Sequence, residues 1–189
     1  MMKRPLVAHE LEELIQAGPL ALSLHWTEGN LVEIRTHWAE KTTESPSLSA
    51  HATKLKTALT RYVAGKAPRW PDLPYDFSRL TDFQQTVLTA LYDVPFGTLC
   101  TYGELAKLVG RPRGAQAIGR AMASNPFPVV YPCHRVIGAN GELTGFSAEG
   151  GLDMKEFLLR LEGSFARLSK KGRPSETGRP SLFDHMSQE

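Results

Sequence analysis

Residues 101–124 are TYGELAKLVGRPRGAQAIGRAMAS, and this stretch decides the fold of the second half of the chain. Thr101 and Glu104 form a capping-box pattern, in which each side chain satisfies a free backbone donor at the start of a helix. A break at Gly110–Gly114 follows the first apolar stripe, and small residues continue to Ser124. The stretch therefore predicts a helix, a short turn and a second helix.

The second predicted helix is almost without bulky side chains. If Ile118 and Met122 point into the core, the opposite face is thin and nearly smooth. A face of this kind can approach a nucleic-acid backbone or a minor groove closely, but small residues also allow two helices to pack tightly. The pattern alone leaves both interpretations open. The residues expected on this face and in the basic turn beside it are Arg113, Ala115, Gln116, Gly119, Arg120 and Ala123.

A short apolar run, Phe127–Cys133, follows the helix pair and contains two prolines. It predicts a short strand with an incomplete ladder, and Cys133 lies at its end. A free thiol with a pKa of ~8.5 is mostly protonated at neutral pH, so a nucleophilic role needs a base or a positive charge, which His134 and Arg135 offer. Because neighbours on a strand point to opposite faces, help from His134 would pass through a water molecule or around the end of the strand. A buried structural cysteine beside an ordinary histidine is the alternative.

Glu162 closes the last predicted helix, Asp153–Glu162, where a negative charge opposes the helix dipole by ~0.3 to 1 kcal/mol. A buried carboxylate directed at an imidazole raises the basicity of that imidazole. Glu162, His134, a water molecule and Cys133 can therefore form one proton-transfer chain. A solvated surface glutamate is the alternative. The other thiol, Cys100, has only threonines as polar neighbours and is assigned to the core.

The first half of the chain predicts an α/β unit. Alternating residues in 20–26 and 31–38, joined by turn residues at 27–30, predict a β-hairpin. An apolar stripe from Leu55 to Val63 predicts an amphipathic helix. Three prolines in 66–76 exclude both a helix and a central strand, so we interpret this segment as a linker.

These patterns divide the chain into three parts. Residues 1–76 form an N-terminal α/β domain whose linker occupies 65–76, and residues 77–168 form a mostly helical domain that begins with a capping box. Residues 169–189 are polar, repeat the sequence Gly-Arg-Pro-Ser, and are expected to be disordered. For this tail we expect no more than nonspecific attraction to phosphate groups.

Composition narrows the functional class. The 189 residues, of which 41% are hydrophobic and 22% charged, fit a folded globular protein without an apolar run long enough to span a membrane. We find no secretory signal at the N-terminus and expect a cytoplasmic protein. Two isolated cysteines exclude a disulfide scaffold and a CxxC zinc site, so we expect no metal and no cofactor. A net charge of +2 permits a nucleic-acid partner without requiring one.

Five motifs in a fixed order resemble the O6-alkylguanine-DNA alkyltransferase family, also called methylated-DNA–protein-cysteine methyltransferases. They are TYGELA at 101–106, NP at 125–126, PCHRV at 132–136, GELTG at 141–145, and KEFLL at 155–159 with Glu162. The resemblance implies a ribonuclease-H-like N-terminal α/β domain and a C-terminal domain with a helix-turn-helix and an active-site strand. It also implies a monomer that binds double-stranded DNA containing O6-alkylguanine and transfers the alkyl group irreversibly to a cysteine, in a single turnover.

The resemblance also implies roles for individual residues. Cys133 would be the alkyl acceptor, activated through water by His134 and Glu162, and Tyr102 would help rotate the nucleotide and protonate the departing guanine. Asn125 matches a hinge between the recognition helix and the active-site strand. The thin helix would bind the minor groove, and extrusion of the damaged base would cost a few kcal/mol, recovered in the pocket. The remaining implied contacts are Arg135 with DNA, and Val136, Phe146 and Ser147 with the extruded base.

Two departures from the family pattern keep the function open. Gln116 stands where the family has an arginine that inserts into the base stack, and the loop Phe146–Gly151 is two residues longer than usual. Because glutamine lacks the charge and planar stacking of guanidinium, we expect weaker extrusion or a changed substrate range. A sensor that binds lesions without repairing them is one alternative, which Cys133 opposes and Gln116 favours. A cysteine hydrolase using Cys133 and His134 is another, for which we find no oxyanion-loop signature.

Overall fold

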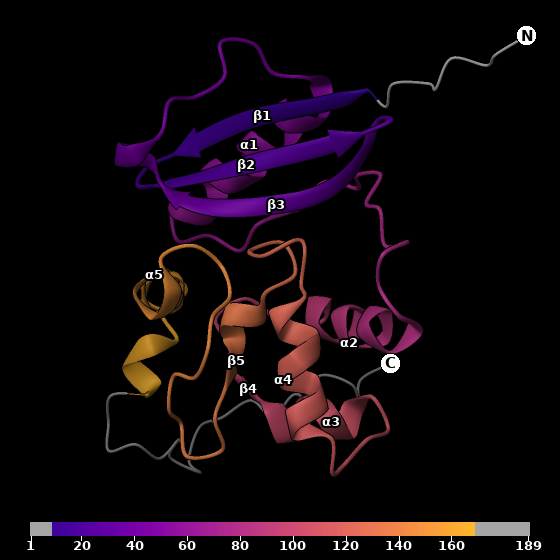
Figure 1. The fold of residues 1–189 in the computed structure, drawn as a ribbon. Helices are drawn as coiled ribbons and strands as arrows, with labels where there is room; N and C mark the ends of the chain where they lie inside the picture. Colours follow the sequence, from indigo (N-terminus) through magenta and orange to yellow (C-terminus); the bar gives the residue numbers. More distant parts are fainter. Residues whose placement is uncertain (1–8, 169–189) are drawn as a thin grey trace, which may run out of the picture.

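The structure, a computed structural model, describes residues 9–168 and has a mixed α/β fold in two stacked parts. A three-stranded sheet with one helix behind it forms the upper part in Figure 1, and a group of short helices forms the lower part. The mixed α/β fold class predicted from the sequence is confirmed. The predicted disorder of residues 169–189 concerns a segment outside the described residues.

The sheet has the order β1–β2–β3, with β1 at Glu10–Ala17, β2 at Leu20–Thr27 and β3 at Asn30–Trp38. Both strand pairs are antiparallel, and the predicted hairpin corresponds to β2 and β3. Strand β1 was not predicted from the sequence, because three glutamates interrupt its apolar alternation. One of them, Glu13, is buried, and it accepts hydrogen bonds from the backbone and the hydroxyl of Ser49, which offset the cost of its burial.

Helix α1, Ala50–Val63, packs on the sheet as its apolar stripe predicted. The chain reaches it from β3 through a short 3-10 helix, Ala39–Lys41. The Ser49 side chain caps α1 by accepting a hydrogen bond from the backbone of Ala52. The fully buried Tyr62, in the last turn of α1, faces the second part of the molecule.

The predicted linker lies against the sheet. Within residues 66–76 there is no helix, as the prolines required. The backbone N–H of Leu31 in β3 donates to the carbonyl of Pro74 at 2.9 Å, and the Leu31 carbonyl accepts from Asp76 N–H at 2.9 Å. The linker is therefore held in place along β3.

The second part contains both predicted capping boxes. Helix α2 is Asp82–Tyr92, and the helix-turn-helix consists of α3, Tyr102–Leu108, and α4, Ala115–Ala123. The reciprocal hydrogen bonds expected at the starts of α2 and α3 are both present. The last α-helix, α5, is Gly151–Leu161 and begins two residues earlier than predicted, and a 3-10 helix at Phe165–Arg167 follows it.

The predicted strand at Phe127–Cys133 is wrong. Residues 126–131 form bends and turns, with Val129 in the left-handed region at a φ of 74° and the Tyr131 N–H bonded to the Phe127 carbonyl. Prolines on both sides remove the backbone donors that a ladder needs. Cys133 starts a 3-10 helix, Cys133–Arg135. A strand follows only after this helix: β5, Val136–Ile137, pairs in parallel with β4, Cys100–Thr101.

One hydrophobic core joins the two parts. It contains Leu59 and Tyr62 of α1 together with Phe127, Val130 and Leu158 from the second half of the chain, all of them buried. A second core lies between α2, α3 and α4 and includes Cys100 and Cys133. The assignment of Cys100 to the core is therefore confirmed. The domain boundary at residue 76 stays a prediction, because the first core spans it.

Candidate active site

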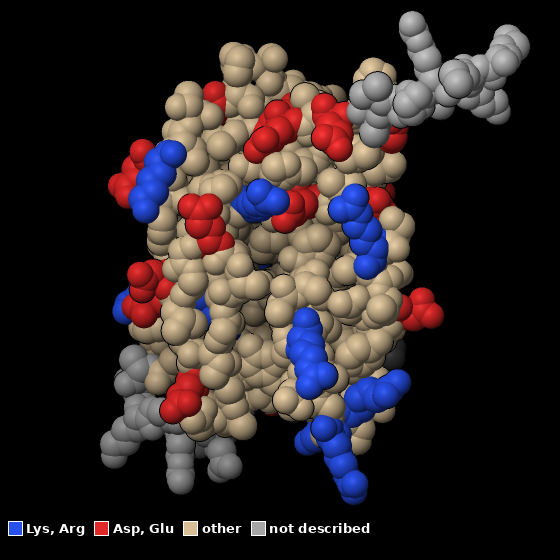
Figure 2. Space-filling model, in the orientation of Figure 1, with Lys and Arg blue, Asp and Glu red and all other residues tan. Residues whose placement is uncertain are grey.

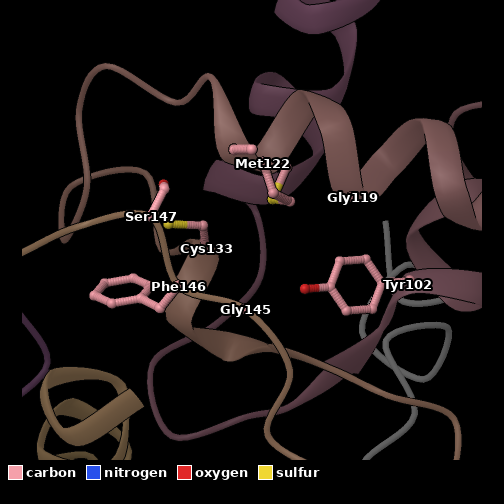
Figure 3. Close-up of a pocket in the computed structure, with 8 residues that line it drawn as sticks. Tyr102, Gly119, Met122, Cys133, Gly145, Phe146 and Ser147 are labelled. Carbon is pink, nitrogen blue, oxygen red and sulfur yellow. The ribbon is translucent and has the colours of Figure 1, made fainter. Parts of the chain in front are cut away.

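A cavity of about 260 Å³ lies between α4, the start of α3 and the loop before α5. Figure 3 shows the Tyr102 hydroxyl directed toward this space and the Cys133 sulfur directed toward Ser147, on the loop that also carries Phe146. The site therefore combines residues from four segments of the chain. The residues that line it are Tyr102, Gly119, Met122, Ala123, Cys133, Gly145, Phe146 and Ser147.

Cys133 is 7% exposed and borders the cavity. Burial raises the pKa of its thiol, while hydrogen bonding from Asn125 and the positive charge of Lys155 act in the opposite direction. The resting thiol is therefore neutral and needs a base to become a nucleophile.

His134 supplies a base next to this thiol. Its Nε2 lies 2.7 Å from Oε1 of Glu162, and both side chains are fully buried. Burial lowers the pKa of His134, partly opposed by the Glu162 charge, so the imidazole is neutral at pH 7. Because Nε2 donates to the carboxylate, Nδ1 is the acceptor nitrogen, and it has no hydrogen-bond partner among the described residues. The predicted pairing of His134 with Glu162 is present.

Glu162, the C-cap of α5, is the centre of a buried cluster of hydrogen bonds. Burial alone would raise its pKa, but the charges and hydrogen bonds of His134 and Arg135 outweigh burial and hold its pKa well below the ordinary value. The Arg135 guanidinium donates to both carboxylate oxygens at 2.9 Å. The backbone of Gly97 and the hydroxyl of Tyr62 donate as well, at 3.1 and 2.8 Å. The carboxylate thus has five donors.

Arg135 does not occupy the position that the sequence analysis expected. It is 4% exposed, and besides its ion pair with Glu162 it donates to the carbonyl of Val94 and lies over the ring of Phe96. The expected contact with DNA is therefore wrong for Arg135. The position of Arg135 directly after a cysteine and a histidine did not indicate that a buried carboxylate would pair with its charge.

Asn125 holds the turn between α4 and Cys133. Its side-chain amide donates to the carbonyl of Tyr131 at 2.9 Å, and its side-chain oxygen accepts from the Phe127 N–H at 3.0 Å. These bonds satisfy backbone groups of the turn, as expected for a hinge asparagine. Asn125 therefore fixes how Cys133 is presented to the cavity.

The outer face of α4 has the expected shape. Ala115, Gln116, Arg120 and Ala123 are exposed and Gly119 is half-buried, while Ile118 and Met122 are buried. In Figure 2, Lys and Arg side chains lie over α3 and α4, and most of the visible Asp and Glu side chains lie over the sheet. The exposed cations of these two helices and the turn between them are Lys107, Arg111, Arg113 and Arg120.

The loop before α5 forms one wall of the cavity and is held at both ends. The Lys155 ammonium donates to the carbonyls of Thr144 and Val136 at 2.8 and 2.6 Å. Near the other end, Oε2 of Glu149 lies 2.6 Å from Nδ1 of His37 in β3. Phe146 and Ser147 line the cavity as the resemblance implied, whereas Val136 is fully buried in β5 and lies outside its lining.

Four residues of the site were missed by the sequence analysis as functional residues. Met122 and Gly145 line the cavity, but the sequence placed the first in the core and the second in a turn. Lys155 is the first residue of the KEFLL motif and lies one helical turn before the buried Leu159, but neither feature indicated a role in the site. Tyr62 carried no signal beyond its place in the α1 stripe.

Among residues 9–168, no cluster of three or more His, Cys, Asp or Glu side chains could hold a metal ion. No helix in the described part of the chain is long and apolar enough to cross a membrane.

A helix-turn-helix beside a buried thiol, with a histidine and a glutamate behind it, defines a class of proteins that present a nucleophilic cysteine at a DNA-binding fold. Residues 82–164 match the family model described as 6-O-methylguanine DNA methyltransferase, DNA binding domain. A Mycobacterium tuberculosis protein named methylated-DNA–protein-cysteine methyltransferase is 40% identical over 149 residues, which are 79% of this chain and 84% of that protein. The chain therefore belongs to the methylated-DNA–protein-cysteine methyltransferase family.

Other relatives agree with this assignment. A Methanosarcina acetivorans protein of the same name is 55% identical over 84 residues, covering 44% of this chain and 53% of that protein. The crystal structure of M. tuberculosis O6-methylguanine methyltransferase has a TM-score of 0.67 and 36% identity, and covers 82% of this chain and 94% of its own. A structure of the M. tuberculosis protein in complex with DNA has a TM-score of 0.65 and 35% identity, and covers 86% and 94%.

Proposed function

We propose that this chain repairs duplex DNA by transferring the alkyl group from O6 of guanine to Sγ of Cys133, once per molecule. One observation carries the proposal: the Cys133 thiol borders a cavity beneath α4 and is followed directly by the buried His134–Glu162 pair. The names of the M. tuberculosis relatives, and the DNA-bound structure of one of them, support the same reaction.

The proposed proton path starts at the thiol. Cys133 gives its proton through one water molecule to Nδ1 of His134, whose Nε2–H stays bonded to Glu162. The imidazolium that forms is stabilised by the carboxylate. Sγ then bonds to the alkyl carbon as the carbon–O6 bond breaks, and the guanine leaves with the electron pair of that bond. A thioether cannot release the alkyl group, so the protein acts once.

The proposed route into the cavity requires the damaged base to leave the duplex. The thin face of α4 lies in the minor groove, and Tyr102, at the N-terminus of α3, rotates the nucleotide and supplies the proton that the departing guanine takes up. Unstacking costs a few kcal/mol, and less for a damaged pair. Stacking on Phe146 and hydrogen bonds in the cavity offset this cost.

The cytoplasmic, monomeric state expected from the sequence stays a prediction.

Intact-mass spectrometry tests the reaction. After incubation with a duplex containing O6-methylguanine, we expect the protein to gain one methyl group, located on the peptide with Cys133, and the duplex to contain unmodified guanine. A Cys133→Ser variant should gain nothing, and a Cys100→Ser variant should react like the parent. Repair at the parental rate by Cys133→Ser would contradict the proposal, and turnover of an acyl ester would favour a hydrolase instead.

Gln116 keeps a lesion-binding sensor as the second candidate. It is exposed on α4, where the family has an arginine that stabilises the gap left by the extruded base. We expect Gln116→Arg to increase the rate of alkyl transfer from duplex DNA, and to leave the rate with the free base O6-benzylguanine unchanged. No gain with duplex would reject the idea that Gln116 weakens extrusion. Tight lesion binding without any transfer would support the sensor.

A further inference from the structure

Tyr62 connects the N-terminal part of the molecule to the proton path. Its hydroxyl donates to Oε1 of Glu162 at 2.8 Å and lies 3.3 Å from Nε2 of His134. The tyrosine belongs to α1, and Glu162 is one hundred residues further along the chain. Tyr62 is fully buried, with its ring against Trp70 and Phe96.

The oxygen that accepts from Tyr62 is the oxygen that binds the base. Oε1 of Glu162 also accepts from Nε2 of His134 at 2.7 Å and from the Arg135 guanidinium at 2.9 Å. A donor on a carboxylate oxygen reduces the negative charge available to its other partners. The Tyr62 hydroxyl therefore weakens the stabilisation that Glu162 gives to a protonated His134.

We propose that Tyr62 is a positioning residue of the acceptor site, which sets the basicity of His134 through Glu162 and so tunes the reactivity of Cys133. The proposal rests on the proposed function, in which Cys133 is the nucleophile. It also gives the N-terminal part a role in the chemistry, because the hydroxyl that adjusts the base comes from α1.

The charged and titratable groups around this network are few. Arg135 faces Glu162 from the 3-10 helix, and Lys155 faces Cys133 and His134 from α5. Burial, and then the Glu162 charge, raise the pKa of Tyr62 well above its ordinary value, so the hydroxyl remains a donor throughout the range in which Cys133 and His134 titrate.

The test is the pH dependence of Cys133 alkylation by iodoacetamide, measured on the full chain by peptide mass. Tyr62→Phe removes the hydroxyl and keeps the ring contacts, so His134 becomes more basic and the thiol loses its proton more easily. We expect the midpoint of the profile to move to lower pH by about half a unit or more. An unchanged midpoint with lower thermal stability would mean that Tyr62 is only structural, and would overturn the proposal.

Two controls isolate the path. Tyr75→Phe removes another buried hydroxyl that packs against the same core and has no hydrogen-bond partner among the described residues, so the midpoint should stay in place. In a Glu162→Gln background, Tyr62→Phe should no longer shift the midpoint, because the carboxylate through which it acts is absent. A shift of the same size in that background would overturn the proposal.

A second substitution tests the proposal even if the Tyr62→Phe variant does not fold. Fluorotyrosine at position 62 keeps the ring and strengthens the donor, so the midpoint should move to higher pH, opposite to the phenylalanine variant. A shift to lower pH would contradict the mechanism. Alkylation by iodoacetamide needs no DNA, whereas methyl transfer from duplex tests the proposed function separately. Failure of transfer in the parent, with the midpoint shift intact, would remove the proposed function alone.

Discussion

Lys155 is a fully buried cation whose charge acts on the Cys133 thiol. Burial lowers its pKa to about 8, partly opposed by attraction to Cys133, and its ammonium donates to backbone carbonyls on both sides of the cavity wall. At pH 7 it is therefore charged and favours the thiolate. Above pH 8 it loses its proton, and this support for the thiolate is lost.

Lys155→Met should therefore slow the reaction of Cys133. Without the positive charge the thiol pKa rises, and we expect alkylation by iodoacetamide at pH 7 to slow by about 3- to 10-fold. Lys107→Met, at an exposed position of α3, is the matched control and should react like the parent. Equal rates in all three proteins would show that the Lys155 charge does not act on the thiol.

Glu162→Gln should change stability in a pH-dependent way. The pKa of Glu162 is lowered in the fold, so the carboxylate contributes stability above its unfolded pKa of ~4.3, and this contribution is lost as pH falls through the lower folded pKa. At pH 7 the variant leaves the Arg135 charge buried without its partner, a loss of ~3 to 5 kcal/mol in the free energy of unfolding.

Urea unfolding at pH 7 and at pH 3 measures this effect. The difference between parent and variant should narrow at the lower pH, because Glu162 is then protonated in the unfolded parent and still ionised in the folded parent, which favours unfolding of the parent. A difference that stays constant with pH would mean that the glutamine disturbs packing and that the lost charge contributes little.

Individual residues differ in how far the sequence predicts them. We could select Cys133, His134 and Glu162 as candidate site residues because few residue types can activate a thiol. Their order along the chain also matches the motifs of the family. Arg135 was assigned to the wrong place, because an arginine is exposed by default unless a carboxylate meets it in the interior. Tyr62 could not be found, since its partner lies one hundred residues away and helical periodicity says nothing about a hydroxyl.

Elements with strong local signals were predicted well. Both capping boxes formed where Thr and Gln or Glu are three residues apart, and the hairpin formed at its turn. The strand predicted before Cys133 is wrong. Its apolar residues favour a strand, but its prolines remove backbone donors that a strand needs. Strand β1 was missed because its buried Glu13 is satisfied by Ser49, from another segment, which the local sequence does not show.

The loop before α5 should control which alkyl groups fit. Its Glu149 carboxylate binds His37, whose other ring nitrogen lies 2.8 Å from the Ser23 hydroxyl, so the sheet holds the cavity wall. Glu149→Gln weakens this contact and should raise transfer from O6-benzylguanine relative to O6-methylguanine in DNA. Because a partly exposed ion pair contributes ~0.2 to 1 kcal/mol, we expect at most about a fivefold change.

Competition between the two modified oligonucleotides measures this ratio. Glu142→Gln, at an exposed site in the turn that precedes the loop, is the control and should keep the parental ratio. A ratio unaffected by Glu149→Gln would mean that the cavity wall is set by Lys155 alone.

The whole molecule should unfold in one step. The first core includes residues from both halves, so neither part can lose its packing without exposing apolar surface of the other. All three tryptophans, at 26, 38 and 70, lie in the first half, whereas Cys133 lies in the second. Tryptophan fluorescence and thiol accessibility should therefore give the same urea midpoint. Two separate midpoints would show that the halves fold independently.

The division into an N-terminal and a C-terminal domain, predicted from the sequence, describes only part of how the whole molecule is built. The prolines correctly marked an irregular connection, but they gave no indication that it would bind along β3 or that Phe127 would enter the same core as α1. Contacts between segments far apart in the chain depend on the assembled shape, and local patterns do not encode them.

Gly97 shows how far the acceptor site extends beyond its cavity. This residue has a φ of 75°, its N–H donates to the Glu162 carboxylate, and a Cβ there would lie 3.0 Å from the Glu162 carbonyl oxygen. A side chain would thus be strained by the positive φ and would crowd the backbone that carries the acid. A choice of positions for mutagenesis that considered only the cavity lining would therefore leave out Gly97, although its backbone supports the acid that pairs with His134.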